Sequence, residues 1–382
     1  MSPAPHERLD VDALVDDPGT RIIVCCGAGG VGKTTTAAAL GLRAAERGRR
    51  AVVITVDPAR RLAQSLGLES LDNTPRPVPL PEGAAGSMHA MMLDMKRTFD
   101  EVVEQHADPD RARQILDNPF YQTLSTSFSG TQEYMAMEKL GQLRQSEDWD
   151  LIVVDTPPSR SALDFLDAPE RLGRFLDGRL IRFLSAPAST GAFRLLGAGF
   201  NLVTSAIGRI VGAQLLDDLR SFVAAFDTVF GGFQERAERT YRLLRTPGTA
   251  FVVVAVPDTD AMREASYFVE RLATDSMPLA GLVVNRTHPL PGGPAAGLGA
   301  REAVAAAESL ERSGSHPLAS AALRLHAERV RTREREGRLR DTLLSSHEGV
   351  RVAEVAALPE DVHDLAGLRG IGEALARASR DR

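Results

Sequence analysis

Short apolar runs alternate with amphipathic stretches along most of the chain. The runs are rich in Val and Ile, which is typical of strands buried on both faces. After the first run, TTTAAALGLRAAERG (34–48) has the period of a helix with a small-residue inner face, ended by Gly48. The alternation predicts an α/β fold with a doubly wound, mostly parallel sheet flanked by helices. The predicted strands are RIIVCC (21–26), AVVITVD (51–57), MHAMMLD (88–94), DLIVVD (150–155), AFVVVAV (250–256) and AGLVVN (280–285).

Three parts of the chain depart from this alternation. Residues 95–149 and 161–246 show only helical patterns, and together they predict an inserted helical subdomain beside the sheet. Residues 288–299 form a Gly/Pro-rich loop that leads into a strongly charged helical stretch. We therefore expect a charged helical insertion over about 288–345, whose mixed charges solvate an exposed face. The remaining pattern predicts an N-terminal tail over 1–20 and a single domain over 21–382.

Composition and charge exclude several classes of function. The 382 residues carry a net charge of -6, so no overall positive field attracts nucleic acid or an anionic membrane. No apolar run reaches the roughly 20 residues that span a bilayer, and the acidic N-terminus lacks the apolar core of a signal peptide. Cys25 and Cys26 are neighbours in a predicted strand and point to opposite faces, which disfavours a disulfide or a metal cage. We expect a cytoplasmic protein with no transmembrane segment that binds no nucleic acid.

A glycine-rich loop joins the first predicted strand to the first predicted helix. Gly27, Gly32, Lys33 and Thr34 match the spacing G-x-x-x-x-G-K-[ST] of a phosphate-binding loop, the P-loop or Walker A motif. In such a loop, backbone N–H groups face phosphate oxygens, the lysine contacts the β- and γ-phosphates, and the hydroxyl binds Mg²⁺. This predicts a P-loop NTPase; the alternative is a glycine turn without a ligand. The expected nucleotide-binding residues are Gly27, Gly29, Gly30, Val31, Gly32, Lys33, Thr34 and Thr35.

Two aspartates at strand ends supply what phosphoryl transfer needs besides the loop. Asp155 ends the run DLIVVD, at the edge where α/β sheets carry their chemistry, and we expect it to hold Mg²⁺ together with Thr34. Asp57 ends the second strand, and we expect it to act in catalysis with Lys33 by positioning the attacking water. The alternative role of Asp57 is a helix cap before Pro58, and both roles are compatible.

At these residues the chain resembles the arsenical pump and tail-anchored-protein targeting ATPases (the ArsA group), dimeric P-loop proteins related to MinD, ParA and the nitrogenase iron protein. The resemblance covers about residues 21–372. It implies ATP and Mg²⁺ as ligands, adenine contact by Asn285, and a loop around Leu358 and Pro359 that closes over the base. The matching blocks are GAGGVGKTT, DPARRLAQSLG with Asp57 at switch I, DTPPSRSALDFL beginning at Asp155 at switch II, GLVVNRT and VAALPEDVHDLAGL.

The resemblance fails at one position of the P-loop. The family's loop usually reads G-K-G-G-V-G-K, and its first lysine reaches the phosphates held by the other subunit, whereas this chain has Ala28 there. An alanine cannot neutralise charge in the transition state. Three explanations stay open: a heterodimer with a paralogue that keeps the lysine, a cation supplied within the chain by Arg60 or Arg61, or a catalytically weak regulatory subunit. We favour the heterodimer.

The resemblance also implies a client that is bound and released as ATP is hydrolysed. In targeting members a groove of helices from both subunits holds a hydrophobic protein segment, and residues 191–233 are apolar enough to build one; packing within the chain is the alternative. Metalloid binding lacks clustered thiolates, and His288 stands alone where some members carry C-x-x-C. A MinD- or ParA-like positioning ATPase and a nucleotide-binding module without hydrolysis are the remaining alternatives.

Overall fold

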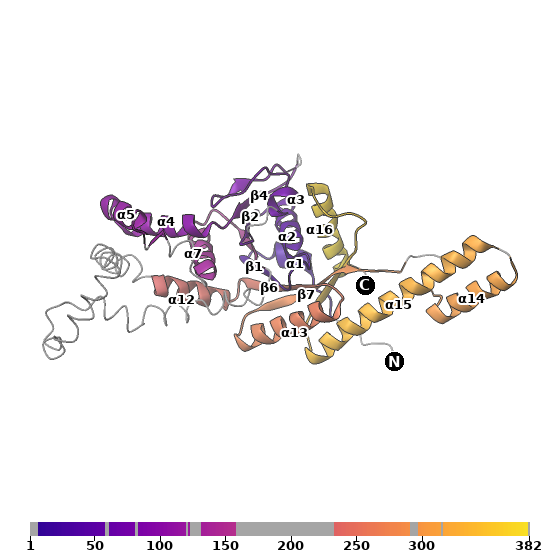
Figure 1. Ribbon diagram of the computed structural model, residues 1–382. Helices are drawn as coiled ribbons and strands as arrows, with labels where there is room; N and C mark the ends of the chain where they lie inside the picture. Colours follow the sequence, from indigo (N-terminus) through magenta and orange to yellow (C-terminus); the bar gives the residue numbers. More distant parts are fainter. Residues whose placement is uncertain are drawn as a thin grey trace, which may run out of the picture.

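The chain folds around one large sheet. The computed structural model describes residues 7–57, 61–80, 83–119, 121–122, 131–157, 233–290, 297–314 and 316–380. Within these residues, eight strands lie in the order β3-β4-β2-β5-β1-β6-β7-β8 (Figure 1), and every neighbouring pair is parallel except β3 and β4. This is the predicted α/β fold. The strands are β1 (Ile22–Cys26), β2 (Arg50–Thr55), β3 (Arg76–Pro77), β4 (Ser87–Met92), β5 (Leu151–Asp155), β6 (Thr249–Ala255), β7 (Leu279–Thr287) and β8 (Val352–Ala356).

Helices cover both faces of the sheet. Successive residues of a strand point to opposite faces, and in β1 Cys25 belongs to one buried apolar cluster while Cys26 belongs to the other. The helices that pack on the cluster around Cys25 are α1 (Val11–Asp16), α2 (Lys33–Glu46), α3 (Arg61–Ser65) and α16 (Leu365–Arg380). Those that pack on the cluster around Cys26 are α4 (Met95–His106), α5 (Pro109–Leu116), α7 (Thr131–Gln145), α12 (Phe233–Leu244) and α13 (Thr259–Thr274) (Figure 1).

Helix α2 lies close against the sheet because its inner face consists of small residues. A Cβ added at Gly41 would come within 2.4 Å of Val53 Cγ2 on β2, so a larger residue there would push the helix outward. Ala37 and Ala44 are fully buried on the same side. The N-terminus of α2, where the P-loop ends, is therefore held at a short distance above the sheet.

Part of the expected N-terminal tail is folded onto the domain. The Asp10 side chain caps α1 by accepting from the Ala13 amide, and Val11 and Val15 are buried. The amide of Leu9 donates to the carbonyl of Val352 at 3.0 Å, which attaches this segment to the β8 edge of the sheet. From residue 7 onward the segment therefore belongs to the domain, because its apolar side chains pack into the cluster around Cys25.

The expected helical regions correspond to helices that pack beside the sheet. Residues 95–149 contain α4, α5 and α7, and α12 is the described part of 161–246. α7 packs against both α4 and α12, and buried side chains of these helices share the apolar cluster around Cys26. The apolar stretch 191–233 lies, apart from Phe233, outside the described residues.

The charged insertion forms a helical hairpin that projects away from the sheet (Figure 1). Its helices, α14 (Ala300–Arg312) and α15 (Pro317–Ser346), meet through Ala303, Ala327 and Val330. The far end of α15 is anchored: Leu343 and Leu344 are buried, and Arg340 bonds Glu354 of β8. Most other charged positions of the hairpin face solvent. No helix in the described part of the chain is both long and apolar enough to cross a membrane.

Candidate active site

The P-loop connects β1 to α2 in a backbone conformation that requires glycine at two positions. Gly27 has φ +147° and Gly32 has φ +97°, values that residues with a side chain rarely adopt. The lack of room for a side chain also requires glycine at both positions. A Cβ at Gly27 would lie 2.1 Å from the Val254 carbonyl oxygen, and one at Gly32 would lie 2.2 Å from Asn285 Nδ2. The loop therefore owes its shape to β6 and β7 as well as to its own sequence.

Lys33 is held inside the loop by a hydrogen bond to the backbone. Its Nζ donates to the Ala28 carbonyl oxygen at 2.8 Å, and the side chain is only 6% exposed. Burial lowers the pKa of Lys33, while the negative charges of Asp155 and Asp57 oppose that shift. The ammonium thus lies beside the carboxylates, at the N-terminus of α2 where backbone N–H groups favour anions.

Asp155 and two threonine hydroxyls form the centre of the site. Thr34 Oγ1 donates to Asp155 Oδ2 at 2.7 Å, and Thr55 Oγ1 donates to the same oxygen at 2.8 Å. The side chain is completely buried, yet Oδ1 has no hydrogen-bond partner. Leaving a buried carboxylate oxygen unpaired is costly. Mg²⁺ prefers carboxylate and hydroxyl oxygens and takes only one or two carboxylates besides phosphates, so these residues fit that ion.

Burial raises the pKa of Asp155 to about 6, although the hydroxyls of Thr34 and Thr55 and the charge of Lys33 act in the other direction. The carboxyl is therefore protonated more readily in the folded protein than in the unfolded chain. Without a metal ion, this group stabilises the fold fully below about pH 4, and that contribution is lost as pH rises through about 6.

This titration gives a testable expectation for an Asp155→Asn variant, whose amide stays neutral. Between pH 4 and pH 7 in the presence of a chelator, the unfolding free energy of the wild type should fall by about 2 kcal/mol relative to the variant. Denaturant titrations of both proteins at several pH values measure this difference. A difference that stays constant across the range would contradict the raised pKa.

A cavity of about 580 Å³ opens above this centre at the carboxyl ends of the strands. Asp57 lines it together with Arg61 of α3, and the amide of Asp57 donates to Thr55 Oγ1 at 3.2 Å. The alternative role of Asp57, a helix cap before Pro58, involves residues 58–60, which include Arg60 and lie outside the described residues. The full lining is Gly30, Gly32, Lys33, Thr34, Thr35, Asp57, Arg61, Gln64, Ser65, Thr156, Arg286, Asp361, Val362 and His363.

Asn285 braces the P-loop. Its Nδ2 donates to the Val31 carbonyl oxygen at 2.9 Å, and its Oδ1 accepts from the amide of Arg286 at 2.9 Å. Asn285 thus lies against the loop, next to the cavity but not in its lining. Its expected contact with adenine stays a prediction.

The loop after β8 contributes to the cavity, while the expected closure of Leu358 and Pro359 over the base stays a prediction. Leu358 and Pro359 are exposed and do not line the cavity, whereas Asp361, Val362 and His363 do. Sequence reasoning also missed Thr55, Thr156 and Arg286. A signal existed for Thr55, the one polar side chain inside an otherwise apolar strand, and Arg286 directly follows the asparagine that was singled out.

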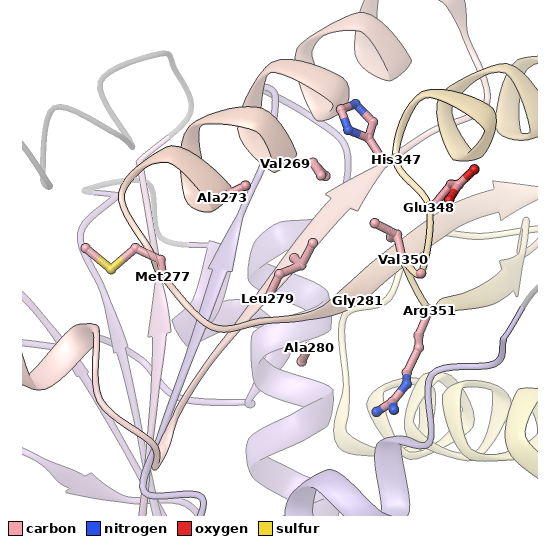
Figure 2. Close-up of a pocket in the computed structure, with 11 residues that line it drawn as sticks. Val269, Ala273, Met277, Leu279, Ala280, Gly281, His347, Glu348, Val350 and Arg351 are labelled. Carbon is pink, nitrogen blue, oxygen red and sulfur yellow. The ribbon is translucent and has the colours of Figure 1, made fainter.

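A second cavity, of about 510 Å³, lies at the opposite end of β7 (Figure 2). It is lined by Val269 and Met277 from the α13 side, by Leu279, and by His347 and Arg351 from the segment before β8. None of the predicted site residues reaches it. The candidate site residues within the described part of the chain therefore lie at one edge of the sheet, the edge that carries the P-loop.

Comparison with known proteins gives one matching family and a set of relatives. The family described as anion-transporting ATPase matches residues 20–296. The chain is 27% identical over 310 residues to "ATPase GET3B" of Arabidopsis thaliana, covering 75% of this chain and 69% of the relative. It is 26% identical over 280 residues to "ATPase GET3" of Malassezia globosa, covering 73% and 76%. The matched region contains the P-loop, both aspartates and Asn285.

Proposed function

The chain belongs to the anion-transporting ATPase family, and we propose that it is a Mg²⁺-dependent switch whose two states are set by ATP binding and hydrolysis. The resemblance to the ArsA group is confirmed by this family, and the relatives named as ATPases support ATP hydrolysis as the reaction. One observation carries the Mg²⁺ part of the proposal. Asp155 receives two hydroxyls on Oδ2 and keeps a buried, unpartnered Oδ1 directly beside the phosphate loop.

Each side chain of the site has a role in this proposal. The ammonium of Lys33 exchanges the Ala28 carbonyl for oxygens of the β- and γ-phosphates, and the backbone N–H groups of residues 27–35 hold the phosphate chain. Thr34 and Asp155 would hold Mg²⁺, which when bound neutralises charge on the phosphates. Asp57 accepts a hydrogen bond from the attacking water and orients it.

A Thr34→Val variant tests the metal site. Valine has the shape of threonine without the hydroxyl, so ATP should still bind but Mg²⁺ should no longer strengthen its binding. In calorimetric titrations with and without EDTA, we expect the benefit of Mg²⁺ to shrink by at least about 10-fold. Thr36→Val is the matched control, because Thr36 is a buried threonine two residues later in α2 that does not line the cavity. An unchanged Mg²⁺ effect in Thr34→Val, or no heat with the wild type, would refute the proposed site.

We further propose that the working species is a dimer, and that Ala28 makes it a heterodimer. A homodimer would lack the cross-subunit lysine at both sites, whereas a paralogue that keeps the lysine would deliver it to the nucleotide held by this chain. The alternative is a weak hydrolase that serves as a regulatory subunit. Co-purification with a lysine-bearing paralogue, followed by turnover measurements, separates the two. Equal turnover with and without the paralogue would remove the heterodimer.

The proposed client is a hydrophobic protein segment, taken up by helices of the inserted subdomain in a cytoplasmic protein. Support comes from the resemblance to targeting ATPases and from the apolar composition of residues 191–233. Loss of the γ-phosphate would change the segments that follow Asp57 and Asp155, and those segments lead into the helical regions. Isolation of this chain from its own cells should recover a client whose bound amount changes when ATP is added. Recovery that ATP does not alter would refute the switch.

A further inference from the structure

The end of β7 has an irregular backbone beside the P-loop. The pairing of β7 with β8 shifts register between Val284 and Thr287, and Arg286 has φ +58°. A residue with a bulky side chain rarely adopts this left-handed conformation, which costs about 1 kcal/mol or more unless the surroundings impose it. In a regular strand, neighbouring residues would point to opposite faces. The irregularity instead lets Asn285 reach the loop while Arg286 lines the cavity.

Both neighbours of Arg286 are held in place, so its position is not accidental. Asn285 bonds the Val31 carbonyl. Thr287 is 3% exposed, its hydroxyl donates to the Val355 carbonyl at 3.3 Å, and its carbonyl accepts from the Ala357 amide at 2.8 Å. The surrounding strands thus keep the Arg286 backbone in its left-handed conformation. Strain that is maintained in this way points to a function for the side chain.

Arg286 lines the same cavity as Lys33 and Thr34. Among the ion pairs of the described residues, none involves its guanidinium. The other charged residues in the lining are Arg61, Asp57 and Asp361. Cations and carboxylates are therefore almost balanced before a ligand enters, so a triphosphate would need further positive charge. Position 28 supplies no positive charge, because this chain has alanine where related loops carry lysine.

We infer that Arg286 binds the phosphate oxygens of ATP from within the same chain, an inference that rests on the proposed function. A guanidinium forms paired, charge-assisted hydrogen bonds with phosphate oxygens and remains charged at any relevant pH. Its place is favourable for the phosphates, since Asn285 joins it to Val31 and Gly32 of the loop. Arg286 acts on nucleotide affinity. The missing lysine at position 28 concerns the transition state instead.

The test compares variants of Arg286 by ATP affinity and by thermal stability without nucleotide. Arg286→Gly should bind ATP at least about 10-fold more weakly, because charged hydrogen bonds are lost, while its stability stays equal or rises, because glycine accepts φ +58° freely. Arg286→Lys keeps the charge and should bind more tightly than Arg286→Gln, which keeps a flat polar end without charge. Arg61→Ala, from the same cavity, tests the other possible source of the cation, and Arg301→Ala, at an exposed position of α14, is the control.

Each other result overturns the inference. Wild-type affinity in Arg286→Gly shows that the guanidinium does not touch the nucleotide. Glutamine binding as well as or better than lysine shows a role in stacking or shape rather than in phosphate charge. A loss in Arg61→Ala with none in the Arg286 variants assigns the cation to α3. Failure of the wild type to bind ATP refutes the proposed function itself, which is a distinct outcome.

Discussion

An Asp57→Asn variant should bind ATP as the wild type does and hydrolyse it about 10²–10⁴-fold more slowly. Asp57 lines the nucleotide cavity at the end of β2, and its amide bonds the same Thr55 hydroxyl that donates to Asp155. Its negative charge acts on both Lys33 and Asp155, so its carboxylate lies near the proposed metal ligands, where it would orient a water toward the γ-phosphate. An asparagine preserves size and the backbone contact but accepts the water's proton poorly. Phosphate release, measured at saturating ATP, reports the effect.

The control for this variant is Asp361→Asn, which removes a carboxylate from the same cavity on the side of the loop after β8. Its turnover should stay within about threefold of the wild type, since no step of the proposed reaction uses that group. Comparable losses in both variants would show that Asp57 contributes only general charge. An unchanged rate in Asp57→Asn would remove it from the catalytic residues.

An Ala28→Lys variant should hydrolyse ATP faster than the wild type when each chain is purified alone. Restoring a lysine at this position returns a cation that could reach the partner's phosphates. For the comparable arginine finger the effect is about 10³–10⁵ in rate, so we expect a gain of at least about 10²-fold in kcat. Ala28 is half-buried and has no left-handed backbone, so a lysine is sterically compatible with the loop. Steady-state kinetics at saturating ATP measure the gain.

Ala28→Met serves as the control, because it adds a similar length without charge. If lysine and methionine have the same effect, the electrostatic explanation fails. If the wild type alone is already as fast as Ala28→Lys, a cation within the chain is sufficient and the heterodimer is unnecessary. The variant should also leave ATP affinity nearly unchanged, which separates its effect from that of Arg286.

Local sequence was sufficient wherever burial or spacing alone decides the structure. Val-rich runs such as AFVVVAV became central strands because a strand covered on both faces has no polar side to show. The P-loop residues were equally visible, since their chemistry requires a fixed spacing on consecutive residues. Asp155 could be placed because it directly ends such a strand, and the structure brings it to the Thr34 hydroxyl.

Long-range contacts decided what the sequence left hidden. Arg286 lines the cavity because β7 shifts register against β8 and because Asn285 bonds Val31 of the P-loop. Both β8 and the P-loop are far from Arg286 in the sequence. The N-terminal segment has the pattern of a tail because its buried apolar residues, Leu9, Val11 and Val15, are few. The residues that they contact lie far away in the chain. Leu358 and Pro359 belong to the loop after β8. Composition alone does not show which residues of that loop lie next to the cavity.

The long helix α15 connects the nucleotide edge of the sheet to a distant point in space. Its Glu336 is almost fully buried and holds both the amide and the ring of His288, only two residues after Arg286. From that junction about 20 residues run to the exposed tip near Leu318, roughly 30 Å away in a continuous helix. Because the helix is continuous, a tilt of about ten degrees at this junction would move the tip by about 5 Å.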